Sequence, residues 1–219
     1  MLYANDIDGK RISPVKKLKG YCPDCKSEMT PKCGEKMIHH WAHKNILSNC
    51  NYKGETEWHR YWKSKFPIEN CEIIMQHQGE KRIADVYYNG MIYEFQHSPI
   101  TSDEIYQRTE FYNNLGLNII WIFDLTKQFN NQQITIWKNE MTWRHIKDYI
   151  FTSDNFYINL VDDRLIEITN FLDEERYTFT DCYGRERIGN RPPKFTIQDV
   201  HLVEELDDTG WIFKNNENE

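Results

Sequence analysis

The chain of 219 residues contains no long uninterrupted apolar run. A helix that spans a membrane needs roughly 18 to 20 consecutive apolar residues, and no stretch approaches that length. Scattered charges occupy the N-terminus, where a secretory signal would have an apolar segment. Hydrophobic residues still make up 39% of the chain, which is enough for a buried core. We therefore expect a soluble, cytoplasmic protein with no membrane partner.

The sequence also lacks the cysteine pattern of a disulfide-stapled domain. Four of the six cysteines lie before residue 51, and such crowding in a reducing compartment favours a metal site. Cys22 and Cys25 have the spacing of a zinc ligand pair, and His43 and Cys50 could complete a four-coordinate structural Zn²⁺ site. A knuckle held by hydrogen bonds alone is the competing interpretation. Three further side chains are spare candidate ligands: Cys33, His39 and His40.

No basic excess marks the chain as a whole, whose formal net charge is −7. The charges are unevenly spread, because residues 1–67 carry 13 Lys/Arg against 7 Asp/Glu, whereas residues 151–219 carry 7 against 16. A basic front suits contacts with a phosphate backbone, although a solvated surface explains it about as well. The charge pattern therefore permits a nucleic-acid partner without establishing one.

Hydrophobic periodicity and turn signals predict a mixed α/β (α+β) fold. An apolar stripe indicates the first helix, and a capping-box spacing with a following Gly116 delimits the second. The last strand is a nearly continuous apolar run, as in strands that are buried on both faces. The predicted elements, in order, are a helix over 55–66, a strand over 71–78, a hairpin within 82–98, a helix over 101–115 and a strand over 118–125.

The rest of the chain carries no chemical motif that we recognise. Its predicted elements are a strand over 133–137, a short helix over 143–151, strands over 156–160 and 164–168, and a turn-rich loop over 185–193. The resulting division is an N-terminal Cys/His-rich zinc-knuckle segment over 1–52, a core over 53–126 and a C-terminal α+β extension over 127–219. The role of this extension is open, and dimerisation or product recognition would suit it.

The most informative residues flank the turn formed by Asn89 and Gly90. A two-residue hairpin at this turn places Asp85 directly opposite Glu94. Opposed like charges about 4.5 to 5.5 Å apart destabilise a sheet unless a positive charge lies between them. A hard divalent cation would supply that charge, so the pair predicts a metal-dependent enzyme. Two solvated carboxylates on a wet sheet face are the competing interpretation.

A third carboxylate comes from the first predicted helix. Glu55 heads the apolar stripe, whereas Glu57 points about 200° away from it at 100° per residue. Glu55 is therefore the acid expected to face the sheet, and with Asp85 and Glu94 it could supply oxygen ligands for Mg²⁺ or Mn²⁺. Lys63 is a candidate phosphate contact. Helix capping is the structural alternative for Glu55.

Several short motifs follow one another in an order typical of a known family. They are Cys22-Pro-Asp-Cys25, His40-Trp-Ala-His43, Glu55-Thr-Glu-Trp-His59 with Lys63, Ala84-Asp85-Val86, Glu94-Phe-Gln96-His-Ser98, and Arg108 with Tyr112. Together they resemble the CoiA-like competence protein family, a branch of the PD-(D/E)XK nuclease superfamily. The resemblance covers about residues 20–124. It implies a restriction-endonuclease-like αβββαβ core after the zinc knuckle.

The resemblance also implies catalytic roles. Asp85 and Glu94 match the core ligands of Mg²⁺, and Glu55 matches the acid of the first helix. Gln96 stands where the superfamily has its catalytic lysine. A neutral amide cannot serve as a charged clamp, so Gln96 would instead hold the attacking water or a metal-bound oxygen.

Supporting roles follow in the same way. His59 and Lys63 match the face of the first helix beside the acid, and Ser98 closes the strand motif. Arg108 and Tyr112 lie one turn apart on the second helix and would approach the scissile phosphate or its neighbours.

The chemistry implied is hydrolysis of a phosphodiester bond by a metal-activated water. A covalent intermediate is not expected, because neither Ser98 nor any cysteine has a base at suitable spacing. The leading prediction is thus a metal-dependent DNA nuclease of the competence or DNA-processing type, with a homodimer and protein partners in DNA processing as further candidates. One alternative is a nucleic-acid-binding or recombination-accessory module without turnover, which Gln96 and the net acidity favour. Another is a protein-interaction module built on the knuckle and the acidic tail.

Overall fold

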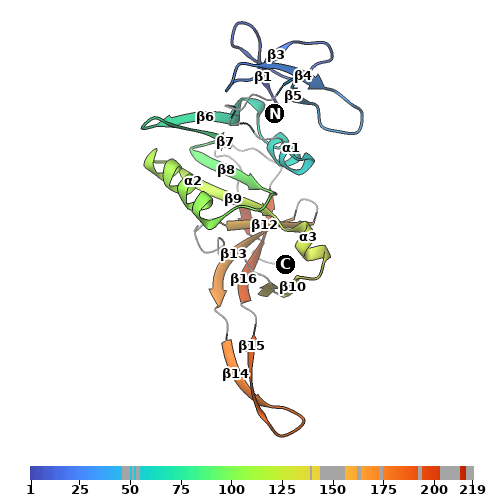
Figure 1. The fold of residues 1–219 in the computed structure, drawn as a ribbon, viewed down its shortest axis with the longest axis vertical. Helices are drawn as coiled ribbons and strands as arrows, with labels where there is room; N and C mark the ends of the chain where they lie inside the picture. Colours follow the sequence, from blue (N-terminus) through green and yellow to red (C-terminus); the bar gives the residue numbers. More distant parts are fainter. Residues whose placement is uncertain are drawn as a thin grey trace. The chain divides into compact units, whose positions relative to one another are not determined.

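The computed structural model describes residues 1–45, 50, 52, 55–138, 140–143, 156–161, 164–172, 175–191, 194–202 and 213–215. Its elements form a mixed α/β protein with a large mixed sheet, in agreement with the predicted class (Figure 1). The chain divides into two compact units, Met1–Pro99 with Arg108–Ile120 and Ile100–Gln107 with Trp121–Glu219. The division into three segments at residues 52 and 126 stays a prediction. No helix in the described part of the chain is long and apolar enough to cross a membrane.

The first unit begins with a five-stranded antiparallel sheet in the order β2-β1-β3-β4-β5. Its strands are β1 (Ala4–Asn5), β2 (Arg11–Ile12), β3 (Gly20–Tyr21), β4 (Glu28–Lys32) and β5 (His40–His43). A small apolar core supports it, formed by Met1, Ala4, Cys22, Met29 and Trp41. A Cβ atom at Gly20 would lie 2.8 Å from Ala4 Cβ and 2.9 Å from the Trp41 ring, so the close packing requires glycine there.

Helix α1 (Glu57–Ser64) is shorter than the predicted helix over 55–66. Thr56 is its N-cap, because the Thr56 hydroxyl accepts a hydrogen bond from His59 N at 3.3 Å. Glu55 therefore precedes the helix instead of heading it. Trp62 and Phe66 of the predicted apolar stripe are buried, and Trp62 stacks on the ring of Phe95 from strand β8 (Met91–Gln96), whereas Trp58 and His59 are only partly buried. A 3₁₀ turn, η1 (Ile68–Asn70), leads to the next strand.

Three antiparallel strands follow, namely β6 (Cys71–His77), β7 (Glu80–Tyr88) and β8 (Met91–Gln96). Asn89 and Gly90 have φ values of +48° and +78°, as a type I′ turn requires. The ladder pairs Val86 with Tyr93, which is the register expected from this turn. The predicted hairpin is therefore confirmed.

The second predicted helix and the strand after it are also present, as α2 (Ser102–Asn114) and β9 (Asn118–Asp124). The Thr101 hydroxyl accepts a hydrogen bond from Glu104 N at 3.2 Å, so the predicted cap forms. Gly116 has a φ of +74° and follows the end of α2. The order of helix, three strands, helix and strand is therefore the one predicted from the sequence.

The second unit is built largely from strands in the order β10-β11-β16-β13-β12-β9, with β17 paired to β16. Strand β12 runs parallel to β9 and pairs Phe156 with Trp121, and both strands are apolar and buried. The remaining bounds are α3 (Thr126–Asn130), β10 (Ile134–Trp137), β11 (Glu140–Trp143), β12 (Phe156–Val161), β13 (Arg164–Leu172), β16 (Lys194–Leu202) and β17 (Phe213–Asn215).

Two predictions for this unit need correction. Trp143 ends strand β11, so a helix does not begin there, and residues 144–151 of the predicted helix lie outside the described residues. The predicted loop over 185–193 is wrong, because β15 (Glu186–Arg191) pairs with β14 (Glu175–Thr180) in a two-stranded sheet. The largely polar sequence of β15 did not indicate a strand, since a hairpin can form without an apolar alternation.

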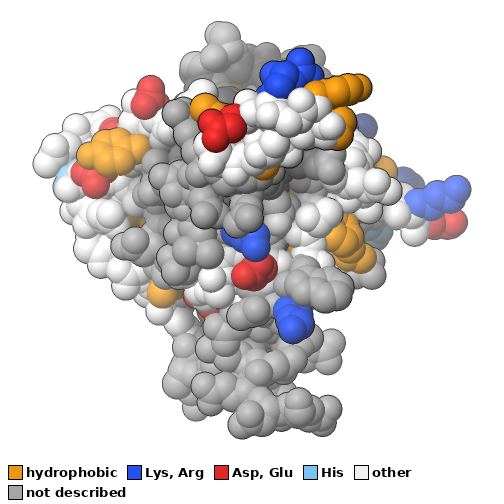
Figure 2. Space-filling model, turned by 90° about the horizontal axis from the view of Figure 1, so that it is seen from below, with side chains coloured by type: hydrophobic (Ala, Val, Ile, Leu, Met, Phe, Trp, Pro, Cys, Tyr) orange, Lys and Arg blue, Asp and Glu red, His pale blue; other side chains and the backbone are white. Residues whose placement is uncertain are grey.

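On the face drawn in Figure 2, described charges of both signs lie among scattered hydrophobic side chains.

Candidate active site and metal centre

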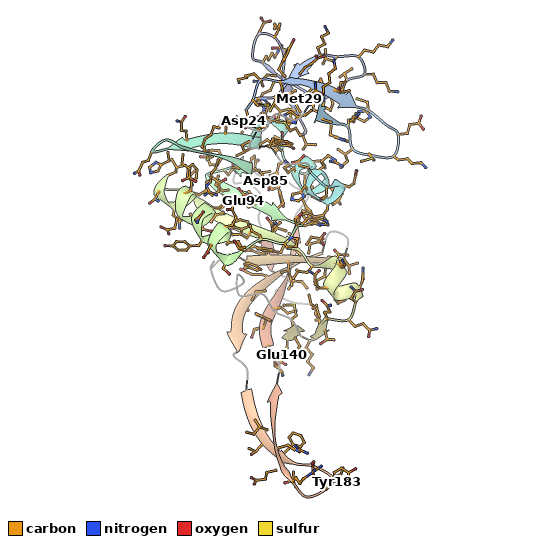
Figure 3. All side chains as sticks on the ribbon, viewed as in Figure 1. Asp24, Met29, Asp85, Glu94, Glu140 and Tyr183 are labelled. Carbon is orange, nitrogen blue, oxygen red and sulfur yellow. The ribbon has the colours of Figure 1, made fainter. Side chains whose placement is uncertain are left out.

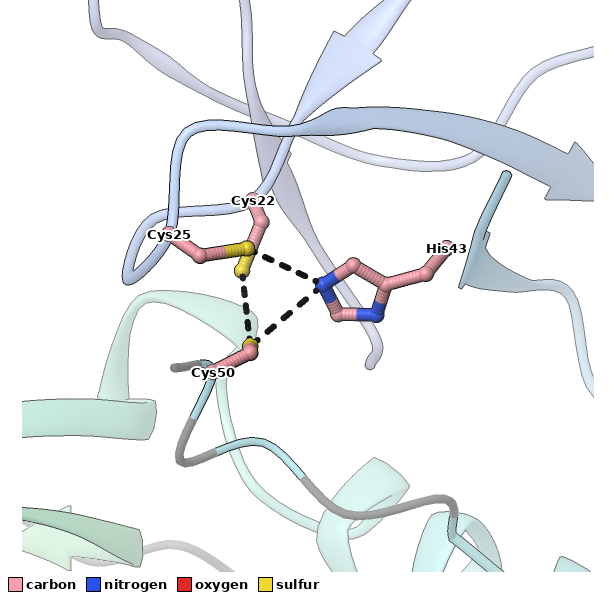
Figure 4. Close-up of side chains that lie close together, drawn as sticks. All are labelled: Cys22, Cys25, His43 and Cys50. Carbon is pink, nitrogen blue, oxygen red and sulfur yellow. Dashed lines mark hydrogen bonds between the residues drawn. The ribbon is translucent and has the colours of Figure 1, made fainter. Parts of the chain in front are cut away.

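Three cysteines and one histidine converge beside the N-terminal sheet (Figure 4). Cys22 directly follows β3, and the turn after it carries Cys25 and is closed by a hydrogen bond from Cys22 N to Ser27 O at 2.9 Å. His43 is the last residue of β5. Together with Cys50 these side chains place their four ligand atoms within 4.8 Å of one another. The structure thus brings together the four predicted zinc ligands.

The dimensions of this Cys-His cluster match a tetrahedral zinc site. The Sγ atoms of Cys22 and Cys50 are 3.8 Å apart, and His43 Nε2 lies 3.4 Å from Cys25 Sγ and 3.5 Å from Cys50 Sγ. A zinc ion with Zn–S bonds of about 2.3 Å and Zn–N bonds of about 2.0 Å has S–S edges of about 3.8 Å and S–N edges of about 3.5 Å. The cluster is therefore consistent with a structural zinc site, since four protein ligands leave no open position for a substrate.

The thiols of the cluster differ in acidity. Burial raises the pKa of Cys22 above its usual value and that of Cys50 to about 12. Burial also acts on Cys25, but hydrogen bonds from Ser27 outweigh it and lower the pKa of Cys25 to about 6. Zinc binding would release the remaining thiol protons, because a coordinating thiol is deprotonated.

The spare candidates lie outside the cluster. His40 Nδ1 is 2.9 Å from the carbonyl oxygen of Ile38, and Cys33 Sγ is 3.5 Å from the carbonyl oxygen of Pro14. Neither side chain shares a ligand group with Cys22, and His39 is exposed. The ligand spacing therefore picked out the convergent set correctly from a larger pool of Cys and His residues.

The second group of functional candidates lies on the hairpin of β7 and β8 (Figure 3). Beyond the last ladder pair, Val86 with Tyr93, the register sets Asp85 opposite Glu94. The strands do not continue their backbone bonding there, because Asp85 Oδ2 accepts a hydrogen bond from Phe95 N at 3.0 Å. The Asp85 side chain thus takes the place of a backbone acceptor and is fixed beside Glu94.

Glu94 is 1% exposed, and two side chains of helix α2 donate hydrogen bonds to its carboxylate. Arg108 Nη1 donates to Glu94 Oε2 at 3.0 Å, and the Tyr112 hydroxyl donates to Oε1 at 2.7 Å. Burial raises the pKa of Glu94 to about 7, and the nearby Asp85 charge adds to this rise while Arg108 opposes it. In this structure Arg108 and Tyr112 bind Glu94, and their approach to a phosphate stays a prediction.

Lys63 lies between Asp85 and two further carboxylates. Lys63 Nζ forms an ion pair with Glu55 Oε1, lies 2.9 Å from Glu72 Oε1 and lies 3.6 Å from Asp85 Oδ1. Burial lowers the pKa of Lys63, but the charges of Glu72 and Asp85 outweigh burial and raise it above its usual value. Lys63 is therefore a buried cation at the centre of the acidic cluster, which we define as Glu55, Glu72, Asp85 and Glu94. With 1% exposure it does not form part of a phosphate-binding surface in this structure.

Glu72 is the member of this cluster that the sequence did not reveal. Its neighbours Cys71 and Ile73 pair with Val86 and Ala84, so Glu72 stands opposite Asp85 in the register. A φ of +54° reorients the backbone at this point, and Glu72 Oε1 also accepts hydrogen bonds from Leu2 N at 3.0 Å and Tyr52 Oη at 3.2 Å. The only available signal was a single acid at the start of a predicted strand.

Gln96 and His59 are engaged near the cluster without joining it. The Gln96 side-chain amide donates to the carbonyl oxygen of Ser98. His59 Nδ1 lies 2.8 Å from the Thr56 hydroxyl, and its ring lies 6.1 Å from that of His97. Among the described residues, the Cys-His cluster alone has the ligand convergence of a ready metal site. The catalytic and supporting roles of Gln96, His59 and Ser98 stay predictions.

Family models match most of the chain in two consecutive segments. Residues 5–53 match the model described as "Competence protein CoiA, N-terminal domain", and residues 57–176 match "Competence protein CoiA, nuclease-like domain". Searches of curated proteins and of solved structures returned no match. The second segment alone spans more than half of the chain and contains three members of the acidic cluster, Glu72, Asp85 and Glu94. The chain therefore belongs to the competence protein CoiA family.

Proposed function

We propose that this protein is a metal-dependent DNA nuclease that hydrolyses phosphodiester bonds during DNA processing. The observation that carries the proposal is the placement of buried Glu94 beside Asp85, where burial and the Asp85 charge raise the pKa of Glu94 to about 7. Two carboxylates in such a position favour a cation between them. The nuclease-like family match and the helix, three strands, helix, strand order support a restriction-endonuclease-like core around this pair.

The acidic cluster has the chemistry of a divalent-cation site. Carboxylate oxygens are preferred ligands of Mg²⁺ and Mn²⁺, and the ion pairs of Lys63 show that three of the four acids converge on one positive charge. Glu72 Oε2 is buried and accepts no hydrogen bond from the part of the chain that the structure describes. Among the described residues, the four acids also outnumber the cationic side chains that contact them, which are Lys63 and Arg108.

In this proposal, different residues bind the metal, the phosphate and the attacking water. Asp85, Glu94 and Glu55 would hold Mg²⁺ or Mn²⁺, which when bound lowers the pKa of a water and stabilises the leaving oxygen. Arg108 is 29% exposed and could exchange its bond to Glu94 for one to a phosphate oxygen of the substrate. Gln96 would orient the water through its amide after releasing the Ser98 carbonyl.

A second function has specific support. Both oxygens of Glu94 already accept hydrogen bonds, from Arg108 and Tyr112, and the Gln96 amide is engaged with Ser98. These contacts would suit a nuclease-fold module that binds nucleic acid without turnover. Such a module need not bind Mg²⁺ at the acidic cluster.

The test combines cleavage with metal binding. Purified protein is incubated with single-stranded DNA, duplex DNA and RNA in the presence of Mg²⁺ or Mn²⁺, and titration calorimetry measures metal affinity. We expect cleavage of DNA by the wild type and its loss in Asp85→Asn and Glu94→Gln. The matched control is Glu80→Gln, which removes an exposed acid from the same strand as Asp85 and should leave cleavage unchanged. Metal binding and cleavage that survive both cluster variants would refute the proposal, as would a wild type inert on every substrate.

A further inference from the structure

The hairpin of β14 and β15 has an unusual combination of exposed side chains. It forms a two-stranded sheet of its own, and such a hairpin gains little stability in isolation. The hairpin nevertheless leaves three large apolar side chains in solvent instead of burying them. Their exposed fractions are 44% for Phe179, 78% for Tyr183 and 74% for Ile188. Figure 3 places Tyr183 at the turn that joins the two strands. Most of the hairpin lies beyond residue 176, where the match to the nuclease-like family model ends.

The register sorts the side chains of the hairpin onto two faces. Phe179 pairs with Arg187, and Asp181 N donates to Arg185 O at 2.9 Å, so these four residues share one face. This basic-aromatic face consists of Phe179, Asp181, Arg185 and Arg187. The opposite face carries the pair of Thr178 and Ile188.

Asp181 organises the two arginines of this face. Its Oδ1 accepts hydrogen bonds from the backbone nitrogens of Tyr183 at 2.9 Å and Arg185 at 3.0 Å. Its Oδ2 accepts from Nε of Arg185 at 3.2 Å and Nε of Arg187 at 3.1 Å. The terminal nitrogens of both guanidinium groups make no hydrogen bond within the described residues, and these side chains are 59% and 52% exposed. Each guanidinium is thus fixed at one nitrogen and open to solvent at the other two.

An aromatic ring accompanies each arginine. Arg185 Cζ lies 5.0 Å from the centroid of the Tyr183 ring, within the range of a cation–π contact. Phe179 stands directly across the hairpin from Arg187. Alternating aromatic rings and guanidinium groups are typical of surfaces that bind single-stranded nucleic acid, since bases stack on the rings while the cations contact the backbone.

The hairpin differs in charge from the sequence on either side of it. Residues 151–219 carry 7 Lys/Arg and 16 Asp/Glu, yet residues 175–191 contain four of those basic residues against three acids. One of these acids, Asp181, is already engaged by both arginines. The sequence of this hairpin is therefore weakly basic within an acidic half of the chain, which suits a polyanion.

We propose that the basic-aromatic face of the β14–β15 hairpin binds single-stranded nucleic acid without sequence preference. Bases stack on Phe179 of this face and on Tyr183 in the adjoining turn, and the terminal guanidinium nitrogens of Arg185 and Arg187 contact phosphate oxygens. The inference rests on the nucleic-acid partner of the proposed function but is independent of cleavage.

Fluorescence anisotropy with a labelled 20-nucleotide oligothymidylate tests the inference in buffer without added Mg²⁺. Phe179→Ala is expected to weaken binding roughly 5- to 150-fold, the range measured when one stacking ring is lost. The double variant Arg185→Gln with Arg187→Gln should reduce the slope of log K against log salt by about 1.4, or about 0.7 for each lost contact. Thermal unfolding confirms that each variant is folded.

Ile188→Ala is the matched control, because it removes a large exposed apolar side chain from the opposite face of the same hairpin. It should bind the oligonucleotide as the wild type does. Wild-type affinity in the Phe179 and arginine variants would overturn the inference. Equal losses in Phe179→Ala and Ile188→Ala, or equal binding of a 20-base-pair duplex, would also do so.

The outcome can be separated from that of the nuclease proposal. Asp85→Asn should abolish cleavage while retaining oligonucleotide affinity, whereas the hairpin variants should lose affinity. If the wild type binds through the hairpin but cleaves nothing, the nuclease proposal fails and the hairpin inference stands. If cleavage depends on Asp85 but affinity ignores the hairpin, the reverse holds.

Discussion

The Cys-His cluster and the acidic cluster of this protein differ in what balances the negative charge of their side chains. The Cys-His cluster has four convergent ligands and no cationic side chain among them. The acidic cluster instead contains Lys63 at its centre and Arg108 beside Glu94. A metal can complete the first without displacing anything, whereas it must compete with protein cations in the second. We therefore expect tight, structural binding at one and weaker, exchangeable binding at the other.

The largest effect should come from opening the Cys-His cluster. Cys22→Ser removes a ligand that also belongs to the small core of the N-terminal sheet. Structural zinc contributes folding free energy directly, with apparent values of about 10 to 16 kcal/mol in zinc-finger peptides. We expect loss of one bound zinc per chain and unfolding of this sheet, measured by elemental mass spectrometry and circular dichroism. Cys33→Ser is the control and should retain zinc. Stoichiometric zinc in Cys22→Ser would remove the basis of the comparison.

The next largest effect should come from removing the central cation of the acidic cluster. Lys63→Met leaves Glu72 and Asp85 buried or half-buried without their partner, and breaking one side of a buried ion pair costs about 3 to 5 kcal/mol. Urea unfolding measures the loss. Lys44→Met breaks an exposed pair with Glu28 and should cost about 0 to 1 kcal/mol.

Adding Glu72→Gln to Lys63→Met sharpens this prediction. The second substitution removes one of the stranded charges, so the double variant should be more stable than Lys63→Met alone. Strictly additive losses would show that the two residues do not act as a pair.

We expect pH to have a smaller effect on stability and on Mg²⁺ affinity. The pKa of Glu94 is raised from 4.5 to about 7, so between these values the folded metal-free protein keeps a proton that the unfolded chain has lost. Stability of the metal-free protein should therefore fall as pH rises through this window. Mg²⁺ needs the ionised form, so its affinity should rise about tenfold from pH 6 to pH 8, as measured by calorimetry. A pH-independent affinity in the wild type would contradict the assignment of Glu94 as a ligand.

The smallest effect should come from Arg108→Gln. Arg108 opposes the rise in the pKa of Glu94, so its removal should raise that pKa further and move the pH dependence of Mg²⁺ binding upward. At high pH the variant should bind Mg²⁺ more tightly than the wild type, because one competing cation is gone. Weaker binding at every pH would mean that Arg108 positions Glu94 instead of competing with the metal.

Local signals predicted much of both clusters. The turn at Asn89 and Gly90 fixes its own register, so it correctly predicted the pairs up to Val86 and Tyr93, and the position of Asp85 opposite Glu94 is the next step of that register. Ligand spacing similarly selected Cys22 and Cys25. The prediction that Glu55 is enclosed and Glu57 exposed agrees with side-chain exposures of 8% and 47%, but its helical reasoning does not apply, because Glu55 precedes the N-cap Thr56.

The remaining features depend on contacts that local patterns do not encode. Glu72 joins the acidic cluster through a left-handed backbone conformation that no strand pattern predicts. Lys63 was predicted as a candidate phosphate contact, and its burial follows from pairing with acids on two other elements. Strand β15 forms through cross-strand hydrogen bonds with β14, so the residues of β15 alone did not predict a strand.

The burial of Lys63 has a consequence for chemical labelling. Its side chain is 1% exposed and its ammonium group is held protonated by acidic partners, whereas the Lys44 side chain is 60% exposed. Amine-acylating reagents need an accessible, neutral amine, so Lys63 should remain unmodified while Lys44 reacts. A cation that displaces Lys63 from the carboxylates would free this amine, and mass spectrometry of acylated peptides would then record the occupancy of the acidic cluster directly.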